Sequence, residues 1–448
     1  MENINQLIEK EKITSKQMNV LMIIIIIVFF LRDGFGKNIP VVVFFVLYFL
    51  GFLILSRNEL LQFFLFLIPL SNGSLLYYLN LVFGIFFIFK NAHSIKITNA
   101  ITTSLLLVLW EVLHLLPNTF LGYNENIFKL LGFTLCLIVT TLIISNYKIK
   151  NNYISIMFSW CFGLGAFCGI MLTKYIHYFG LANFTTAVRR FGWIPASLDY
   201  SSTSMLMNPN ELGKLVIITV FCLLTILKVQ REYSYKIVFL ITYFILFGLM
   251  SASRSFLIVF FTLLFVFMLE LIIKPKHNKR IIIVLIITTL LMLIFVTIYM
   301  RPILIIISDR FKSGDVSGSR FDIYRKYFNI LRKSPYLIFG SGMQDYNEKY
   351  GLPYSSHNFF IEIISIWGIV GLALTFFWCI GLYSSLKLKK FIFLKNKTIL
   401  PLLPLLGLFL YEQTGQFFIS YYNTFPPLII ALLNIKYAEL DIKNSLSI

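Results

Sequence analysis

Charged side chains are scarce in this sequence. Only 13% of its 448 residues are charged, whereas 58% are hydrophobic, and its mean hydropathy is +0.82. A water-soluble fold of this size could not bury so much apolar surface. The composition therefore excludes a soluble globular protein and predicts an integral membrane protein.

Cysteine is scarce as well, and its spacing matches no metal site. The five cysteines all lie in apolar runs, where we expect them to pack rather than to form disulfides: Cys136, Cys161, Cys168, Cys222 and Cys379. We predict no redox chemistry, no metal and no cofactor. The apolar run 21–31 is not followed by a small-residue cleavage site, so we expect a retained first helix rather than a removed signal peptide.

Basic residues outnumber acidic ones, which gives a formal net charge of +19. They occur in short clusters between long apolar runs, as in loops that face anionic lipid head groups. This distribution indicates membrane lipid as a partner and excludes nucleic acid.

The hydropathy pattern predicts an all-α, polytopic membrane helix bundle of about 12–14 transmembrane helices, with residues 1–448 as a single membrane domain. Two connections are long enough to carry function, at residues 174–211 and 301–356. We expect both to be extracytoplasmic, and the larger one to form a small helical cap on the bundle. The expected spans are 18–31, 39–55, 60–70, 75–89, 97–116, 127–145, 153–173, 212–228, 236–250, 255–273, 281–300, 357–386, 398–411 and 416–435.

Lysine sets the expected orientation. If the helices alternate from a cytoplasmic N-terminus, the lysine clusters around 148–150, 228–236, 274–279 and 387–397 all fall in the cytoplasm, together with the C-terminus. Arginine shows the opposite bias. Chance in small numbers is one explanation, and the other is an outer site that needs planar, always charged donors for phosphate or carboxylate.

The larger loop contains a predicted amphipathic helix. Phe321, Tyr324, Phe328 and Leu331 recur at helical spacing until Ser334–Pro335 ends the pattern. Ser319 is a candidate N-cap with Asp322 at the box position, and Arg320 then lies in the first turn, where an anion is favoured. A second reading places the opposite, basic face of this helix on lipid head groups.

The residues after this helix resemble a known family. Ser334–Pro335 is followed by Gly340 and Gly342, then by His357–Asn358 at the start of an apolar span, and then by Trp367–Gly368–Ile369–Val370–Gly371. With the preceding arginine, this order resembles the O-antigen polymerase and O-antigen ligase superfamily, whose capsule members are called Wzy-type polymerases. Many relatives have an acidic residue where this chain has Trp367. Glu362 is a candidate replacement, unless no carboxylate is needed.

The resemblance implies a set of site residues. Arg254 and Arg320 would clamp a diphosphate, and His357 would orient or deprotonate the acceptor hydroxyl. Alternative readings are a snorkelling role for Arg254, and helix caps for His357 and for Asn210. The further candidate substrate contacts are Arg325, Asn358, Asn210, Arg189, Arg190, Glu362, Gly340 and Gly342.

The implied function is that of a polysaccharide polymerase of the bacterial inner membrane. This metal-independent glycosyltransferase would join undecaprenyl-diphosphate-linked oligosaccharides of O-antigen or capsule on the outer face, with a chain-length regulator protein as a further partner. A ligase that transfers the finished glycan is the first alternative. The polymerase is favoured because no second histidine lies near His357–Asn358. The second alternative is a flippase for lipid-linked glycan, which should instead carry midplane charges and related halves.

Overall fold

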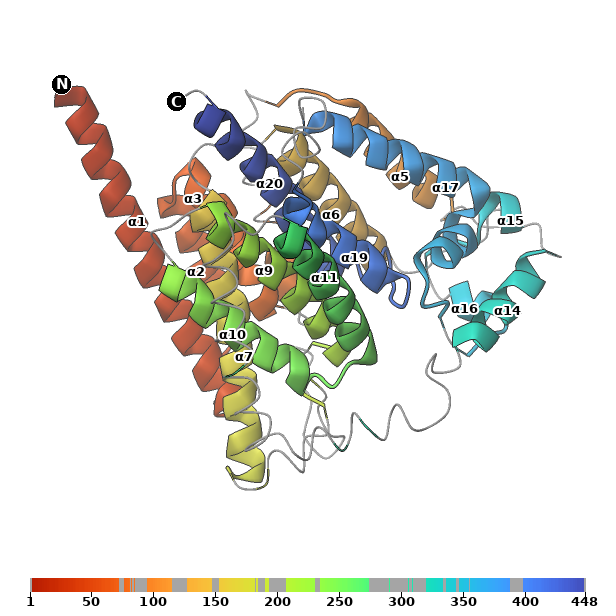
Figure 1. The fold of residues 1–448 in the computed structure, drawn as a ribbon, viewed down its shortest axis with the longest axis horizontal. Helices are drawn as coiled ribbons and strands as arrows, with labels where there is room; N and C mark the ends of the chain where they lie inside the picture. The colour runs from red at the N-terminus through yellow and green to blue at the C-terminus, as the bar shows by residue number, and fades with distance from the viewer. Residues whose placement is uncertain are drawn as a thin grey trace.

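The computed structural model describes residues 2–71, 76–80, 82, 84, 95–114, 127–146, 153–181, 183, 190–192, 207–229, 234–273, 290, 305, 308, 320–332, 336–343, 346–353, 355–386 and 398–446 (Figure 1). This part of the chain consists mainly of helices and contains no strand. The bundle contains α1 (Glu2–Phe29) with the π-turn η1 (Phe30–Gly34), α2 (Val41–Ile54), α3 (Arg57–Ser71), α5 (Asn99–Leu113), α6 (Ile127–Asn146), α7 (Tyr153–Phe179), α9 (Pro209–Val229), α10 (Ser234–Met250), α11 (Arg254–Ile273), α17 (Phe359–Ser385), η4 (Leu400–Leu402) with α19 (Leu403–Glu412), and α20 (Tyr421–Leu446).

The predicted fold class is confirmed. Within the described residues, five helical segments are long and apolar enough to cross a membrane: 16–34, 153–179, 209–228, 254–273 and 359–385. Shorter apolar helices account for most of the other expected spans, and the one expected at 416–435 falls largely on α20, which is 26 residues long. The exceptions are 75–89, which is described only in part, and 281–300, which lies almost wholly outside the described residues.

Helix α9 forms the centre of one half of the bundle. It packs against α7, α10, α11, α19 and α20, and it is the most buried of the five long segments. In the other half, α3 packs along α7. A Cβ on Gly163 of α7 would lie 2.1 Å from the carbonyl oxygen of Phe66 of α3, so only glycine allows this contact. Small residues are typical of such close contacts between membrane helices.

Helix α17 is broken within its length. Gly368 has φ 67° and ψ −166°, which a residue with a side chain rarely adopts. The carbonyl oxygens released by the break are used by the preceding loop: Ser365 O accepts from Ser341 N (3.0 Å), and Ile366 O accepts from Gly342 N (2.8 Å). Non-helical backbone is tolerated inside a membrane bundle where neighbouring segments of the protein satisfy its hydrogen bonds.

From residue 320 onward, the described part of the larger loop forms α14 (Arg320–Leu331), α15 (Tyr336–Phe339) and α16 (Tyr346–Lys349), which make up the expected cap. Glu111 of α5 connects this cap to the bundle. One of its oxygens accepts from Met343 N (3.0 Å), and the other accepts from the indole nitrogen of Trp367 (2.7 Å). The N- and C-termini lie at one end of the molecule, and α14 and α16 lie at the other (Figure 1).

The predicted helix in the cap exists, and its predicted apolar face is confirmed at Leu331 and in part at Tyr324 but is wrong at Phe321 and Phe328. Tyr327 and Leu331 are buried, whereas Phe321 and Phe328 are 74% and 52% exposed. Tyr327 packs against Tyr346 and Tyr350, so the rest of the cap, rather than the regular spacing of phenylalanines, selects the inward face. The predicted N-cap Ser319 lies outside the described residues.

Candidate functional site

Two tight connections meet at the end of the bundle that faces the cap. One precedes α9, where Asn208 Oδ1 accepts from Asn210 N (2.9 Å) and so caps the helix. The other is the turn 251–253 between α10 and α11, in which Ala252 has φ 47°. This turn places Arg254 at the first position of α11. A non-glycine residue in the left-handed region costs about 1–3 kcal/mol, and such strain is concentrated at functional sites.

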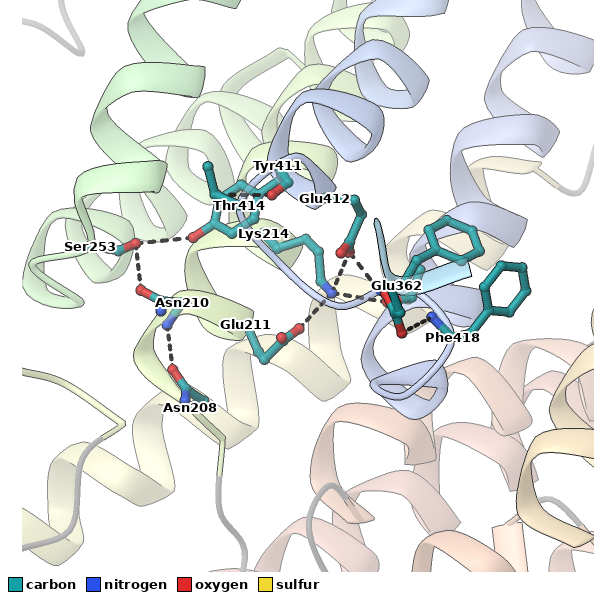
Figure 2. A network of polar contacts seen from close by, with 12 residues as sticks. Asn208, Asn210, Glu211, Lys214, Ser253, Glu362, Tyr411, Glu412, Thr414 and Phe418 are labelled. Atoms are coloured by element: carbon teal, nitrogen blue, oxygen red, sulfur yellow. Dashed lines mark hydrogen bonds and ion pairs between the residues drawn. The ribbon is translucent and has the colours of Figure 1, made fainter. Parts of the chain in front are cut away.

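Asn210 joins these two connections. Its Oδ1 accepts from the guanidinium of Arg190 (2.9 Å). The same oxygen accepts from the hydroxyl of Ser253 (2.9 Å) (Figure 2). Ser253 Oγ also lies 3.1 Å from the hydroxyl of Tyr411, at the end of α19. Asn208 therefore caps α9, and the side chain of Asn210 instead links separate segments of the bundle.

Arg320 of α14 lies within electrostatic reach of both Arg254, at the start of α11, and His357, just before α17. Burial lowers the pKa of Arg320, and the positive charge of Arg254 lowers it further. Burial likewise lowers the pKa of His357, and the charge of Arg320 adds to the effect. Two cations held this close repel each other, so an anion bound between them would be stabilised. A neutral imidazole beside that anion is suited to accept a proton.

His357 is held in a strained backbone conformation with φ 48°. The hydroxyl of Tyr324, on the cap helix α14, donates to the carbonyl oxygen of His357 (3.2 Å) and to that of Gln413 (3.0 Å). The cap is thereby bonded to the start of α17 and to the α19–α20 connection. Tyr324 fixes the position of Arg320 relative to His357, since Arg320 lies one turn earlier on the same helix.

Asn358, rather than His357, caps α17. Its Oδ1 accepts from Phe360 N (3.0 Å) and Ile361 N (3.2 Å), which excludes the cap alternative for His357. The amide nitrogen of Asn358 reaches Gln413. This internal role accounts for Asn358 without a substrate.

A buried ionic cluster lies next to Tyr411. The ammonium of Lys214 contacts Glu211 Oε2 at 2.6 Å and Glu412 Oε1 at 2.7 Å, and it donates to Thr424 Oγ1 at 3.0 Å (Figure 2). The side chains of Lys214 and Glu412 are both 1% exposed. One lysine therefore serves two carboxylates, and Glu412 Oε2 has no hydrogen-bond partner within the described part of the chain.

Glu362 has an internal role. It is fully buried, and its two oxygens accept from the backbone N–H groups of Phe417 (2.6 Å), Phe418 (3.0 Å) and Ile419 (2.8 Å). The carboxylate thus holds the α19–α20 connection against α17. With both oxygens engaged, it is accounted for without a substrate.

Gly340 and Gly342 are explained by packing against neighbouring helices. Both have φ 84°. A Cβ on Gly340 would lie 2.1 Å from the carbonyl oxygen of Ile366, and a Cβ on Gly342 would lie 3.2 Å from the Cβ of His114. Glycine at these positions lets the loop pair with the broken helix.

The predicted site residues therefore separate into groups. Arg254, Arg320 and His357 come together, and Arg190 and Asn210 join them through Ser253 and Tyr411. Arg325 lies on the exposed face of α14. Arg189 lies outside the described residues.

Sequence reasoning missed Tyr324, Tyr411, Gln413 and the Lys214 cluster. Lys214 had a usable signal, since an ionisable residue inside an apolar span indicates a partner within the bundle. Tyr411–Glu412–Gln413–Thr414 at the end of an apolar span was a second signal. Tyr324 had none, because its contacts depend on how the cap is placed.

The fold and these contacts define a polytopic helical membrane protein with a polar site under a small cap. Residues 237–376, just under a third of the chain, match the family model described as O-antigen ligase, which agrees with the O-antigen polymerase and ligase superfamily that the sequence motifs predicted. The match contains Arg254, Arg320 and His357. No curated protein and no solved structure matches the chain.

Proposed function

We propose that this protein is a polysaccharide polymerase, which joins undecaprenyl-diphosphate-linked oligosaccharides on the outer face of a bacterial inner membrane. The observation that carries the proposal is the convergence of Arg254, Arg320 and His357 from separate segments, within a domain of the O-antigen ligase family. Membrane lipid and the lipid-linked glycan are its proposed partners, together with a chain-length regulator.

The proposed chemistry transfers a sugar from one lipid carrier to another. A hydroxyl of the acceptor glycan attacks the anomeric carbon of the donor, while the bond from that carbon to the diphosphate breaks. The electron pair leaves with the diphosphate, whose growing negative charge the guanidinium groups of Arg254 and Arg320 stabilise. The hydroxyl proton passes to the imidazole of His357, which is neutral because its pKa is lowered.

The orientation is part of the proposal. Both termini lie at the end opposite the cap (Figure 1), which agrees with termini in the cytoplasm and with residues 301–356 and 174–211 as extracytoplasmic loops. The donor diphosphate would then meet Arg254 and Arg320 at the outer membrane surface.

The direct experiment uses purified protein in lipid nanodiscs with a lipid-linked oligosaccharide as both donor and acceptor. Arg320→Ala and His357→Ala should each reduce glycosidic bond formation by at least about a hundredfold, within the range for groups that stabilise a developing charge or move a proton. Arg332→Ala, an exposed position directly after the same cap helix, is the matched control. Normal transfer by the first two variants would contradict their assigned roles.

A second experiment separates the polymerase from the ligase. Deletion of a polymerase should leave single repeat units on the final acceptor, whereas deletion of a ligase should leave long chains on the carrier lipid. Liposomes test the flippase: movement of lipid-linked glycan across the bilayer without bond formation would replace the proposed activity.

A further inference from the structure

An apolar groove of about 450 Å³ runs along the bundle next to the candidate site. It lies between the second half of α17 and α19, and α20 contributes to its lining. Trp378, Cys379 and Tyr383 contribute from α17, and Leu406 and Phe409 contribute from α19. Glu412 is the one ionisable acid in this lining.

The groove has a buried floor and an exposed rim. Trp378 and Leu408 are each 1% exposed, whereas Tyr383 and Phe409 are 54% and 45% exposed. Cys379, an exposed cysteine, also lies in the lining. The rim therefore opens sideways, toward the lipid of a surrounding membrane.

One end of the groove reaches the candidate site. Phe359 and Glu412 line that end, and they directly follow Asn358 and Tyr411 in the chain. Tyr324, one turn after Arg320 on α14, donates to the carbonyl oxygen of Gln413 (3.0 Å), the residue that follows Glu412. A molecule with an anionic head at the arginines and a long apolar tail would thus find the start of the groove beside its head group.

We propose that this groove holds the first isoprene units of the donor's polyprenyl chain. The inference rests on the proposed function and adds the place where the lipid tail lies. Leu402, the last residue of η4, and Glu412, the last residue of α19, line the two ends of the groove, about 15 Å apart at the rise of a helix. An isoprene unit adds four chain bonds of about 1.5 Å, which advance an extended zigzag chain by roughly 4–5 Å, so three or four units fill the groove.

The groove positions the tail more than it adds affinity. A polyprenyl chain leaves one apolar solvent for another when it enters the groove, so packing rather than the hydrophobic effect stabilises it there. Binding of the tail in the groove also orients the donor, because a tail fixed beside Phe359 and Glu412 holds the attached diphosphate next to Arg320.

The test combines donors of different chain length with two neighbouring substitutions. Cys379→Trp fills the groove, whereas Ile380→Trp places the same ring at the same depth on a 48% exposed position outside the groove lining. Donors with two, three, four and eleven isoprene units are compared by their KM for glycan transfer in nanodiscs. Leu406→Trp fills the groove from the opposite wall and repeats the test if Cys379→Trp fails to fold.

In the wild type, KM should fall with each added unit up to three or four units and then stay constant. Cys379→Trp should raise KM for the long donors by about three- to tenfold, the scale of a few lost packing contacts, and leave the two-unit donor unchanged. Ile380→Trp should behave like the wild type.

Equal effects of the two tryptophans, or a KM independent of chain length, would overturn the groove assignment while leaving transferase activity intact. Retention of a phospholipid by purified wild type, and its loss from Cys379→Trp without a change in KM, would also overturn it in favour of a structural lipid. Absence of transfer from every donor in the wild type would instead refute the proposed function.

Discussion

Helix α9 carries a lysine toward each end, and the two lysines have very different surroundings. Lys228 contacts Glu270 at 2.7 Å, and the other oxygen of Glu270 accepts from the backbone N–H groups of Ile399 (2.9 Å) and Leu400 (3.2 Å). Each oxygen of that carboxylate is engaged. At the cap end, Lys214 serves both Glu211 and Glu412, and one oxygen of Glu412 is left without a hydrogen bond among the described residues.

The comparison separates a structural clamp from a cluster next to a site. Glu270 holds the start of η4 and α19 at the end of the molecule where the termini lie, and its charge is matched by one lysine. The Lys214 cluster holds an excess carboxylate in a place that burial makes costly. Such an arrangement is not needed to fasten helices together, and it lies beside Tyr411, Ser253 and the candidate arginines.

The largest effect should come from removing Lys214. Lys214→Met leaves two buried carboxylates without their cation, so we expect a loss of about 3–5 kcal/mol in the free energy of unfolding. Thermal unfolding in detergent measures it. Lys214→Met combined with Glu412→Gln should recover part of the loss. An unchanged melting temperature in the single variant would contradict the buried pairing.

Glu270→Gln should have the next largest effect. The amide keeps one acceptor oxygen but turns a donor toward a neighbouring donor, so we expect about 1–3 kcal/mol of destabilisation. Transfer activity per folded molecule should stay unchanged, because the clamp lies far from the cap. A loss of activity without a loss of stability would break the distinction between the two clusters.

The pH dependence of kcat/KM tests the proposed role of His357 at the cap end. The imidazole of His357 can act as a general base only in its neutral form. Burial, together with the positive charge of Arg320, lowers the pKa of His357. The fall of kcat/KM on the acid side should therefore lie below the ordinary histidine pKa of about 6.5. Arg320→Lys keeps the charge and should keep this limb in place, although the rate falls. In Arg320→Met, the acid-side fall of the residual kcat/KM should move to higher pH. If this fall lies at the same pH in both variants, the electrostatic coupling between Arg320 and His357 is contradicted.

Glu412→Gln should have the smallest effect on stability. The substitution removes the excess charge and can keep the bond from Lys214, so we expect a change below about 1 kcal/mol, in either direction. The informative quantity is the difference in destabilisation between Glu412→Gln and Glu270→Gln, measured in the same series of thermal unfolding experiments. Equal destabilisation by the two substitutions would show that the clusters do not differ.

Much of the helical architecture was predictable because lipid imposes it. Apolar runs such as 153–173 and 255–273 must be helical to satisfy their backbone in a membrane, and the structure has α7 and α11 there. The inward face of α14 was predicted only in part, since Leu331 is buried but Phe321 and Phe328 remain exposed, and tertiary contacts of Tyr327 decide the face.

The site was only partly predictable, for a related reason. Arg254, Arg320 and His357 were found by their order along the chain, because each begins or precedes a helix at the same end of the bundle. Tyr324 and Gln413 were not found, because their role rests on contacts between segments 89 residues apart. The break at Gly368 was likewise hidden, although it explains why Gly340 and Gly342 recur in the preceding loop.

The central claim is that Arg254 and Arg320 hold one diphosphate together. Its most direct test is the equilibrium binding of undecaprenyl diphosphate to the wild type, to Arg254→Ala, to Arg320→Ala and to the double variant. Because both arginines contact the same anion, the two losses should be strongly non-additive, with a coupling of about 0.5–3 kcal/mol. Additive losses, or affinity equal to that of the wild type in either single variant, would contradict a shared site.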